Sequence, residues 1–295
     1  MKKILLALGL FASASSAFAY DFQIDGGYTY LDHDYDWIDS NNQVDLKGTY
    51  YFNTVETKNV PLQEAAFFGH SSNVYVRYAY NNLETKDFYI DDYYDSSTND
   101  NYSEYGNFET ESHSTGLGIE YFLNSFYLSG EIGLDQYKSK YNYSAVSQTT
   151  DEVYSYSEKY DDDQTTYKAY LGYLPISNLL VAMGVEGYSG DDEDDAAFGI
   201  KAKYVTPIGQ SGQFLNLEAA GTFNDITNIA LGADYYFNPK FSIGTAYNYQ
   251  DDGDDTADAF AIRTKYFFTE NIGVGTAVGF GDDLTSYNLN ATLRF

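Results

Sequence analysis

The sequence contains no cysteine, four prolines and one tryptophan. Without cysteine there are no disulfides, so a small secreted fold held by disulfides is excluded, together with thiolate chemistry and most structural zinc sites. After its first residues the chain has no run of about 18 to 20 apolar residues, the length that a membrane-spanning helix needs. Basic residues are few, with 16 Lys and Arg against 44 Asp and Glu. The resulting charge disfavours nucleic acid as a partner, because Lys and Arg are what bind phosphate.

The N-terminus has the three parts of a secretory signal. Two lysines are followed by a short apolar run and by the small-x-small sequence Ala-Phe-Ala, which ends at Ala19. This pattern predicts a signal peptide over residues 1–19, with cleavage between Ala19 and Tyr20. Residues 20–295 then form the mature chain, which we expect to be one domain.

The final twelve residues alternate between apolar and polar side chains. Because successive side chains of a strand point to opposite faces, residues 284–295 form a strand with one apolar and one polar face. An amphipathic last strand ending on Phe295 resembles the terminal strand of bacterial outer-membrane β-barrels, where that strand is the signal for assembly. The resemblance implies that the barrel-assembly machinery is a partner and reads Phe295.

Fourteen segments show the same alternation, and the chain is rich in the strand-favouring residues Tyr (33) and Phe (20). In lipid an open sheet edge has no hydrogen-bond partners, so strands can span a membrane only as a closed barrel. We therefore predict an all-β, antiparallel up-and-down transmembrane β-barrel of about 14 strands. A soluble β-sandwich could also bury alternating strands, but it does not need aromatic residues at both ends of the strands. The segments lie near 21–31, 43–53, 73–84, 113–123, 126–138, 164–174, 178–188, 196–206, 213–223, 226–237, 240–250, 257–268, 271–281 and 284–295.

The connections between these segments alternate between short turns and acidic loops, several of which are long. Short periplasmic turns and long extracellular loops are typical of outer-membrane barrels, and an even strand count puts both termini in the periplasm. The loops at 85–112 and 139–163 are long enough to fold inward and narrow a pore. Acidic loops such as Asp191 to Asp195 could bind divalent cations weakly, including cations that bridge to lipopolysaccharide, or could simply form a solvated rim. No other cofactor is expected.

One expected periplasmic turn, residues 54–72, is unusually long. Within it, Pro61 precedes Leu-Gln-Glu-Ala-Ala-Phe, which indicates one or two helical turns with proline at the first position. The run that starts at Gly48, GTYYFNTVETKNVPLQEAAFFGHSSNV, resembles a characteristic N-terminal segment of the general porins of Gram-negative bacteria. The resemblance implies a β-barrel porin and carries no defined site residues. The segment either packs Leu62, Phe67 and Phe68 against the barrel rim or plugs part of the mouth.

Carrying the parity of Phe295 through the other strands places eight basic and seven acidic side chains inside the barrel. Hairpin geometry brings Lys203 near Glu218, Lys201 less closely near Glu186, and Arg77 near Glu120. Such pairs on a wet wall are usually structural and weak. The inward set is Lys47, Arg77, Lys168, Lys201, Lys203, Arg263, Lys265, Arg294, Asp25, Asp45, Glu120, Glu131, Glu186, Glu218 and Asp234, and the predicted pore-lining residues are Arg77, Glu120, Glu131, Glu186, Lys201, Lys203, Glu218, Arg263 and Lys265.

Arg263 and Lys265 differ from the other inward cations, because their neighbours on both adjacent strands are Ser, Gly and Ala. With no acid in easy reach they would extend into the pore and favour anionic solutes. The alternative is that they meet acids from a loop folded into the barrel.

These features predict a passive diffusion channel for small hydrophilic solutes and ions, in outer-membrane lipid, as a monomer or a homotrimer. Two other functions stay open: a structural or adhesive barrel, and a barrel hydrolase that uses His33, His70 or His113. Fourteen strands disfavour a packed interior, because small barrels of about eight strands fill their interiors and larger barrels leave a lumen.

Overall fold

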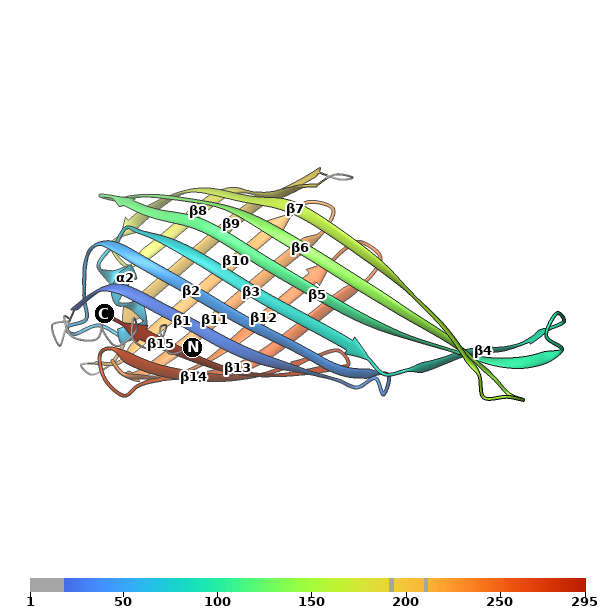
Figure 1. The fold of residues 1–295 in the computed structure, drawn as a ribbon. Coiled ribbons are helices and arrows are strands. Elements are labelled where there is room, and N and C mark those ends of the chain that lie inside the picture. The colour runs from blue at the N-terminus through green and yellow to red at the C-terminus, as the bar shows by residue number, and fades with distance from the viewer. Residues whose placement is uncertain (1–18, 191–193, 210–211) are drawn as a thin grey trace.

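The structure is a computed structural model that describes residues 19–190, 194–209 and 212–295. Residues 1–18, which hold nearly all of the predicted signal peptide, lie outside the described part. A single antiparallel sheet dominates the molecule and is curled into a barrel (Figure 1). No helix among the described residues is long and apolar enough to cross a membrane.

Fourteen of the described strands form the barrel, and strand β4 lies outside it. The sheet runs from β3 through β2, β1 and β15 and then in descending order to β5, and a β3–β5 pairing closes the circle. This confirms the predicted closed antiparallel barrel. The strands are β1 (Ala19–His33), β2 (Ile38–Glu56), β3 (Asn73–Thr85), β4 (Phe88–Asp95), β5 (Asp100–Leu123), β6 (Phe126–Ser147), β7 (Val153–Ile176), β8 (Leu179–Gly190), β9 (Asp194–Pro207), β10 (Phe214–Phe223), β11 (Thr227–Asn238), β12 (Phe241–Asp251), β13 (Thr256–Phe267), β14 (Ile272–Gly281) and β15 (Leu284–Arg294), with a 3₁₀ turn η1 (Leu62–Glu64) and a short helix α2 (Ala65–Phe68) between β2 and β3.

The last strand pairs with the first, as a closed barrel requires. The β1–β15 register runs from Gln23 opposite Arg294 to His33 opposite Leu284. Phe295 extends the pairing by one residue, since its N–H donates to the Phe22 carbonyl over 2.9 Å. We call the barrel end at which β1 begins and β15 ends the proximal mouth, and the other end the distal mouth.

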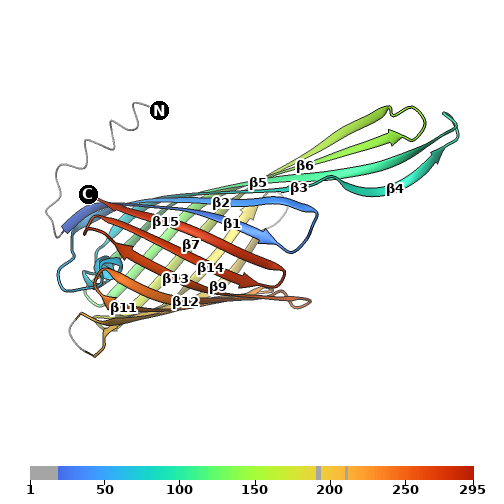
Figure 2. The ribbon, with the colours of Figure 1, turned by 90° about the horizontal axis from the view of Figure 1, so that it is seen from below.

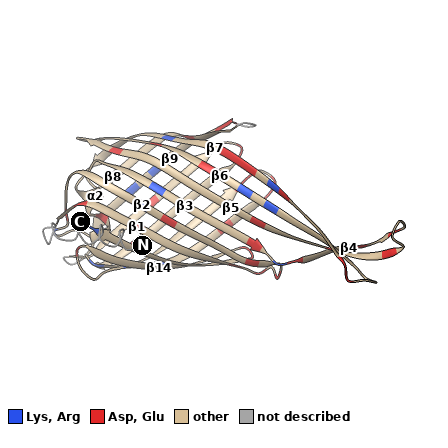
Figure 3. Ribbon diagram, in the orientation of Figure 1, with Lys and Arg blue, Asp and Glu red and all other residues tan. Residues whose placement is uncertain are grey.

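The two faces of the barrel differ as the alternation predicts. On β15, Leu289 is 60% exposed on the outside, whereas Thr292 and Arg294 are each 3% exposed on the inside. An exposed apolar outer face and a hydrogen-bonded polar inner face are what a barrel in lipid requires. Basic and acidic residues are interspersed along the wall (Figure 3).

Beyond the distal mouth, β5, β6 and β7 continue together with β4 as a narrow sheet that projects away from the barrel (Figures 1 and 2). In this extension β5 starts at Asp100, β6 ends at Ser147 and β7 starts at Val153. The prediction that 85–112 and 139–163 are loops able to fold inward and narrow the pore is therefore wrong. The physical reason is that both stretches are rich in Tyr and also contain Thr, and aromatic and β-branched residues favour strands. Tyr102 lies opposite Ser147, for example, and Val146 lies opposite Val153.

Candidate functional site

The predicted turn 54–72, whose first three residues belong to β2 and whose remainder connects β2 to β3, crosses the proximal mouth. The Leu62 N–H donates to the Pro239 carbonyl in the β11–β12 turn over 2.8 Å. The His70 ring lies 2.7 Å from the Ser177 carbonyl in the β7–β8 turn. The segment thus begins on one side of the barrel and is fastened to two turns elsewhere on its rim.

Glu64 fastens the segment to the inner wall. Its side chain is 1% exposed, and its Oε2 lies 2.7 Å from the Lys203 ammonium on β9. Its Oε1 accepts a hydrogen bond of 2.6 Å from the Tyr236 hydroxyl on β11. Lys203 also pairs with Glu218 over 2.7 Å, as predicted. Because a buried carboxylate is tolerated only with close partners, these contacts hold the segment inside the mouth.

Aromatic packing reinforces this attachment. Phe67 packs against a buried cluster on the wall that includes Tyr127 and Leu180. Phe68 meets Phe214 edge-on, with ring centroids 5.8 Å apart. Both predicted features are present together: the aromatic side chains pack on the wall, and the segment fills part of the mouth.

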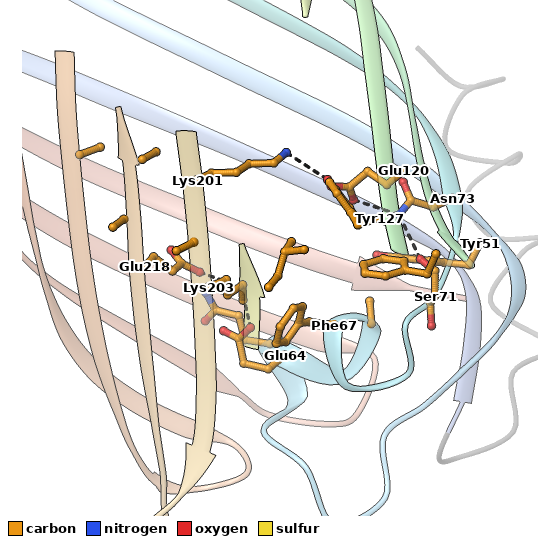
Figure 4. A pocket seen from close by; sticks show the side chains of 18 residues that line it. Tyr51, Glu64, Phe67, Ser71, Asn73, Glu120, Tyr127, Lys201, Lys203 and Glu218 are labelled. Atoms are coloured by element: carbon orange, nitrogen blue, oxygen red, sulfur yellow. Dashed lines mark hydrogen bonds and ion pairs between the residues drawn. The ribbon is translucent and has the colours of Figure 1, made fainter. Parts of the chain in front are cut away.

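A cavity of about 410 Å³ lies between this segment and the wall (Figure 4). Four of the predicted pore-lining residues border it, namely Glu120, Lys201, Lys203 and Glu218. Glu64 and Asn73 also border the cavity, and neither could be assigned to it from the sequence. The only signal for Glu64 was its place in the Pro-Leu-Gln-Glu-Ala-Ala-Phe motif.

Arg263 has an acid partner, so the prediction that no acid lies within its reach is wrong. Its guanidinium donates two hydrogen bonds to Asp234 on β11, of 2.9 and 2.7 Å, and lies 3.9 Å from Glu218. Asp234 is not on an adjacent strand, because Gly244 of β12 lies between the two residues in the register. A Cβ at Gly244 would lie 2.0 Å from Asp234 Oδ1, so the absence of a side chain there lets Arg263 cross a strand. The alternative of an acid from an infolded loop is also wrong, since Asp234 belongs to the wall.

Lys265 has no carboxylate partner among the described residues, and its ammonium donates to Asn290 Oδ1 over 2.7 Å. It remains a candidate for a charge that solutes meet inside the barrel.

Two further pairings differ from those predicted. Arg77 contacts Glu131 on β6 over 2.9 Å rather than Glu120, because Gly116 on the intervening strand lets the side chain pass. Glu186 pairs with Lys168 over 2.8 Å rather than with Lys201.

Lys201 is held by neutral groups. Its ammonium donates to the Tyr127 hydroxyl over 3.1 Å and to Ser129 Oγ over 3.2 Å. It also lies 4.4 Å from the centre of the Tyr170 ring, a cation–π contact. In residues 19–190, 194–209 and 212–295 no carboxylate forms an ion pair with this ammonium.

The histidines make hydrogen bonds that differ from those of a catalytic site. His33 contacts the Asn41 amide over 3.0 Å, and His113 contacts the Tyr78 hydroxyl over 2.9 Å. His70 contacts a backbone carbonyl and stacks on Phe122. In the described part of the chain none of these contacts joins a histidine to a serine hydroxyl or a carboxylate. Part of the acidic run Asp191 to Asp195 lies outside the described residues.

A closed barrel of fourteen strands, apolar outside and lined with paired polar groups inside, defines a transmembrane β-barrel of the outer-membrane type. The whole chain, residues 1–295, matches the family described as "Putative general bacterial porin", and the protein belongs to this family.

Solved structures show the same fold. Outer membrane protein Omp33 of Acinetobacter baumannii is 23% identical, covers 95% of this chain and 100% of its own, and superimposes with a TM-score of 0.61. The TodX deltaS2S3 mutant monoaromatic hydrocarbon channel is 9% identical over 97% of this chain and 92% of its own, with a TM-score of 0.51. No curated protein sequence matches this chain.

Proposed function

We propose that the protein is a porin of the Gram-negative outer membrane, a water-filled channel through which small hydrophilic solutes and ions diffuse passively. The observation that carries this proposal is the inner wall. Charged and polar side chains point into the interior of a barrel of fourteen strands, a size that leaves a lumen. Passive transport needs a hydrated path without a bound state too deep to leave.

The fold supports an orientation in which the proximal mouth faces the periplasm. Ala19, the first described residue, and Phe295 both lie at this mouth, where the assembly machinery would read Phe295. The extension then projects from the cell surface. Segment 54–72 narrows the periplasmic side of the path, since it is fastened to β9, β11 and two turns.

Solute efflux from liposomes tests this function. Vesicles loaded with neutral sugars of increasing size should lose the smallest sugars fastest when they carry the folded protein. Vesicles whose sugars are all retained, despite a correctly folded barrel, would contradict the proposal.

A barrel hydrolase makes a different prediction for the same vesicles. Replacing His33 and His113 with Ala should leave efflux unchanged if the protein is a channel. A lipid- or peptide-cleaving activity that disappears in this double variant would favour the enzyme.

A further inference from the structure

Of the charged groups that border the cavity at the proximal mouth, Lys203 pairs with Glu64 and Glu218, whereas Lys201 and Glu120 form no ion pair with each other. The Lys201 ammonium donates to the Tyr127 hydroxyl, and the same hydroxyl donates to Glu120 Oε1 over 2.6 Å. These two hydrogen bonds place the charges at most about 6 Å apart. A neutral hydroxyl therefore bridges two opposite charges, as the dashed lines in Figure 4 show.

Each of these groups keeps unused hydrogen-bonding capacity. An ammonium has three donors, and Tyr127 and Ser129 take two of those of Lys201. A carboxylate has about four acceptor positions, and the hydroxyl of Tyr127 and the amide of Asn73 fill two of those of Glu120. Asn73 is 4% exposed, lines the same cavity, and its Oδ1 accepts no hydrogen bond. A buried polar atom without a partner is costly, so a bound donor at this position would be favoured.

The rest of the lining is part charged and part apolar: Glu64 and Glu218, both paired with Lys203, border the cavity together with apolar side chains. Phe67 borders it on the side of segment 54–72, and Leu180, Ala220 and Ala230 border it on the wall. A volume of about 410 Å³ lies in the range of sites for small molecules. The cavity thus combines a short electrical dipole with space for a small apolar group.

We propose that this cavity is a weak binding site for α-amino acids in their zwitterionic form. The carboxylate of the solute would accept from Lys201, and its ammonium would donate to Glu120 and to Asn73 Oδ1. The ammonium and carboxylate groups of an amino acid are both attached to the α-carbon, so they are close enough to meet Glu120 and Lys201 at the same time. In that orientation the dipole of the amino acid is antiparallel to the dipole of Lys201 and Glu120. A simple anion would be attracted by Lys201 but repelled by Glu120. A simple cation would be attracted by Glu120 but repelled by Lys201.

The inference deepens the proposed function, on which it rests, by naming a class of solute that pauses at the periplasmic narrowing. Binding at such a site has to be weak for passage to continue. The site would therefore favour amino acids over sugars and ions of the same size by transient occupancy.

Saturation-transfer NMR on the folded protein in detergent micelles tests the proposal. The probes are L-alanine, L-alaninamide, which lacks the carboxylate, and L-lactate, which lacks the ammonium. We expect L-alanine to bind at least about tenfold more tightly than either analogue, because each analogue leaves one charged group without its partner. Equal binding of alanine and alaninamide would overturn the proposal, and this comparison does not depend on any variant folding.

Variants locate the site. Lys201→Gln and Glu120→Gln should each weaken alanine binding by about tenfold or more, whereas Lys201→Arg should retain it. The matched controls are Lys240→Gln and Glu270→Gln, two residues that contact each other at 3.9 Å and that do not line this cavity. Losses of the same size in the controls would contradict the assignment.

Conductance measured on the same preparation separates this inference from the proposed function. A conducting channel that does not discriminate alanine from its analogues would contradict only the amino acid site. A barrel that passes no current but still binds alanine would contradict only the proposed channel function.

Discussion

At the scale of single residues, glycines decide which charges meet on the inner wall. Gly244 lets Arg263 reach across β12 to Asp234, and Gly116 lets Arg77 reach across β5 to Glu131. A Cβ at Gly116 would lie 2.8 Å from Arg77 Nε, and a Cβ at Gly244 would lie 2.0 Å from Asp234 Oδ1. The wall is therefore a set of pairs that skip a strand, in addition to the usual pairs between neighbouring strands.

Asp234→Asn tests the best defined of these pairs. The substitution removes the carboxylate that accepts both hydrogen bonds from Arg263, so the guanidinium is left with Glu218 at 3.9 Å. We expect the reversal potential in a salt gradient to shift toward anion preference, and the barrel to lose about 1–3 kcal/mol of stability. The double variant Asp234→Asn, Arg263→Gln should return selectivity toward that of the wild type. An unchanged reversal potential in the single variant would contradict a role for this pair in selectivity.

Asp100 orders the tip of the extension, outside the barrel. Its carboxylate accepts hydrogen bonds from the hydroxyls of Ser147 and Thr149, and these bonds hold the pKa of Asp100 below its ordinary value. A carboxyl group with a lowered pKa stabilises the folded form above its unfolded pKa, and this contribution is lost as the pH falls through the folded pKa. Ser147 Oγ in turn accepts from the N–H groups of Thr149 and Thr150, over 3.2 and 2.9 Å.

The expected result is pH-dependent protection of the 148–151 turn. Hydrogen-exchange protection of the Thr149 and Thr150 amides should decrease when the pH falls below the ordinary pKa of aspartate. The Asp100→Ala substitution should abolish this protection at neutral pH. Asp91→Ala, on strand β4, is the control. If the Asp100 variant keeps wild-type protection, the carboxylate does not order this turn.

At the scale of elements, two segments depart from a plain barrel: segment 54–72 and the extension. The first is fastened to the barrel wall by Glu64 and by aromatic packing, whereas the second is held by strand pairing and by side-chain contacts between its own strands. Their consequences for conduction differ, because only the first lies across a mouth.

Glu64→Gln should loosen segment 54–72. The variant replaces a buried ion pair with Lys203 by a neutral amide, while Lys203 keeps Glu218. Because breaking a buried pair is strongly destabilising, we expect a larger or noisier single-channel current, with the barrel itself still folded. The control is Glu56→Gln, since Glu56 is exposed at the end of β2. A current identical to that of the wild type would show that the segment does not restrict the path.

Removing the extension should leave the current unchanged. Deletion of residues 87–106 and 143–156 leaves Lys86-Asn107 and Asn142-Ser157 as two-residue turns. The flanking residue pairs already face each other, with Glu84 opposite Glu109 and Tyr141 opposite Glu158. A current that rises severalfold after this deletion would indicate that the extension obstructs the pore.

At the scale of the whole molecule, the barrel and its inside–outside pattern could be predicted from alternation alone. The period of two is a local property, so Leu289 and Thr292 reveal their faces without knowledge of the rest of the chain. The charge pairs could be predicted only between adjacent strands, as for Lys203 and Glu218. The partner of Arg263 could not be predicted, because Asp234 lies two strands away across a glycine. Whether the guanidinium reaches that far depends on three-dimensional packing.

The extension and the cavity show the same limit. The acidic residues at 85–112 are typical of a loop, whereas the Tyr, Phe and Thr between them favour strands. Asn73 lies opposite Glu120 in the β3–β5 register, but Glu64 approaches Lys203 only when segment 54–72 folds across the mouth. No spacing in the sequence carries that information, because the contacts join segments from different parts of the chain.

The central claim, that this barrel conducts, is tested most directly by single-channel recording in a planar lipid bilayer. We expect discrete current steps in potassium chloride when the folded wild-type protein is inserted. The claim would be contradicted by a protein that inserts into the bilayer and shows the heat-modifiable electrophoretic mobility of a folded barrel, yet passes no current.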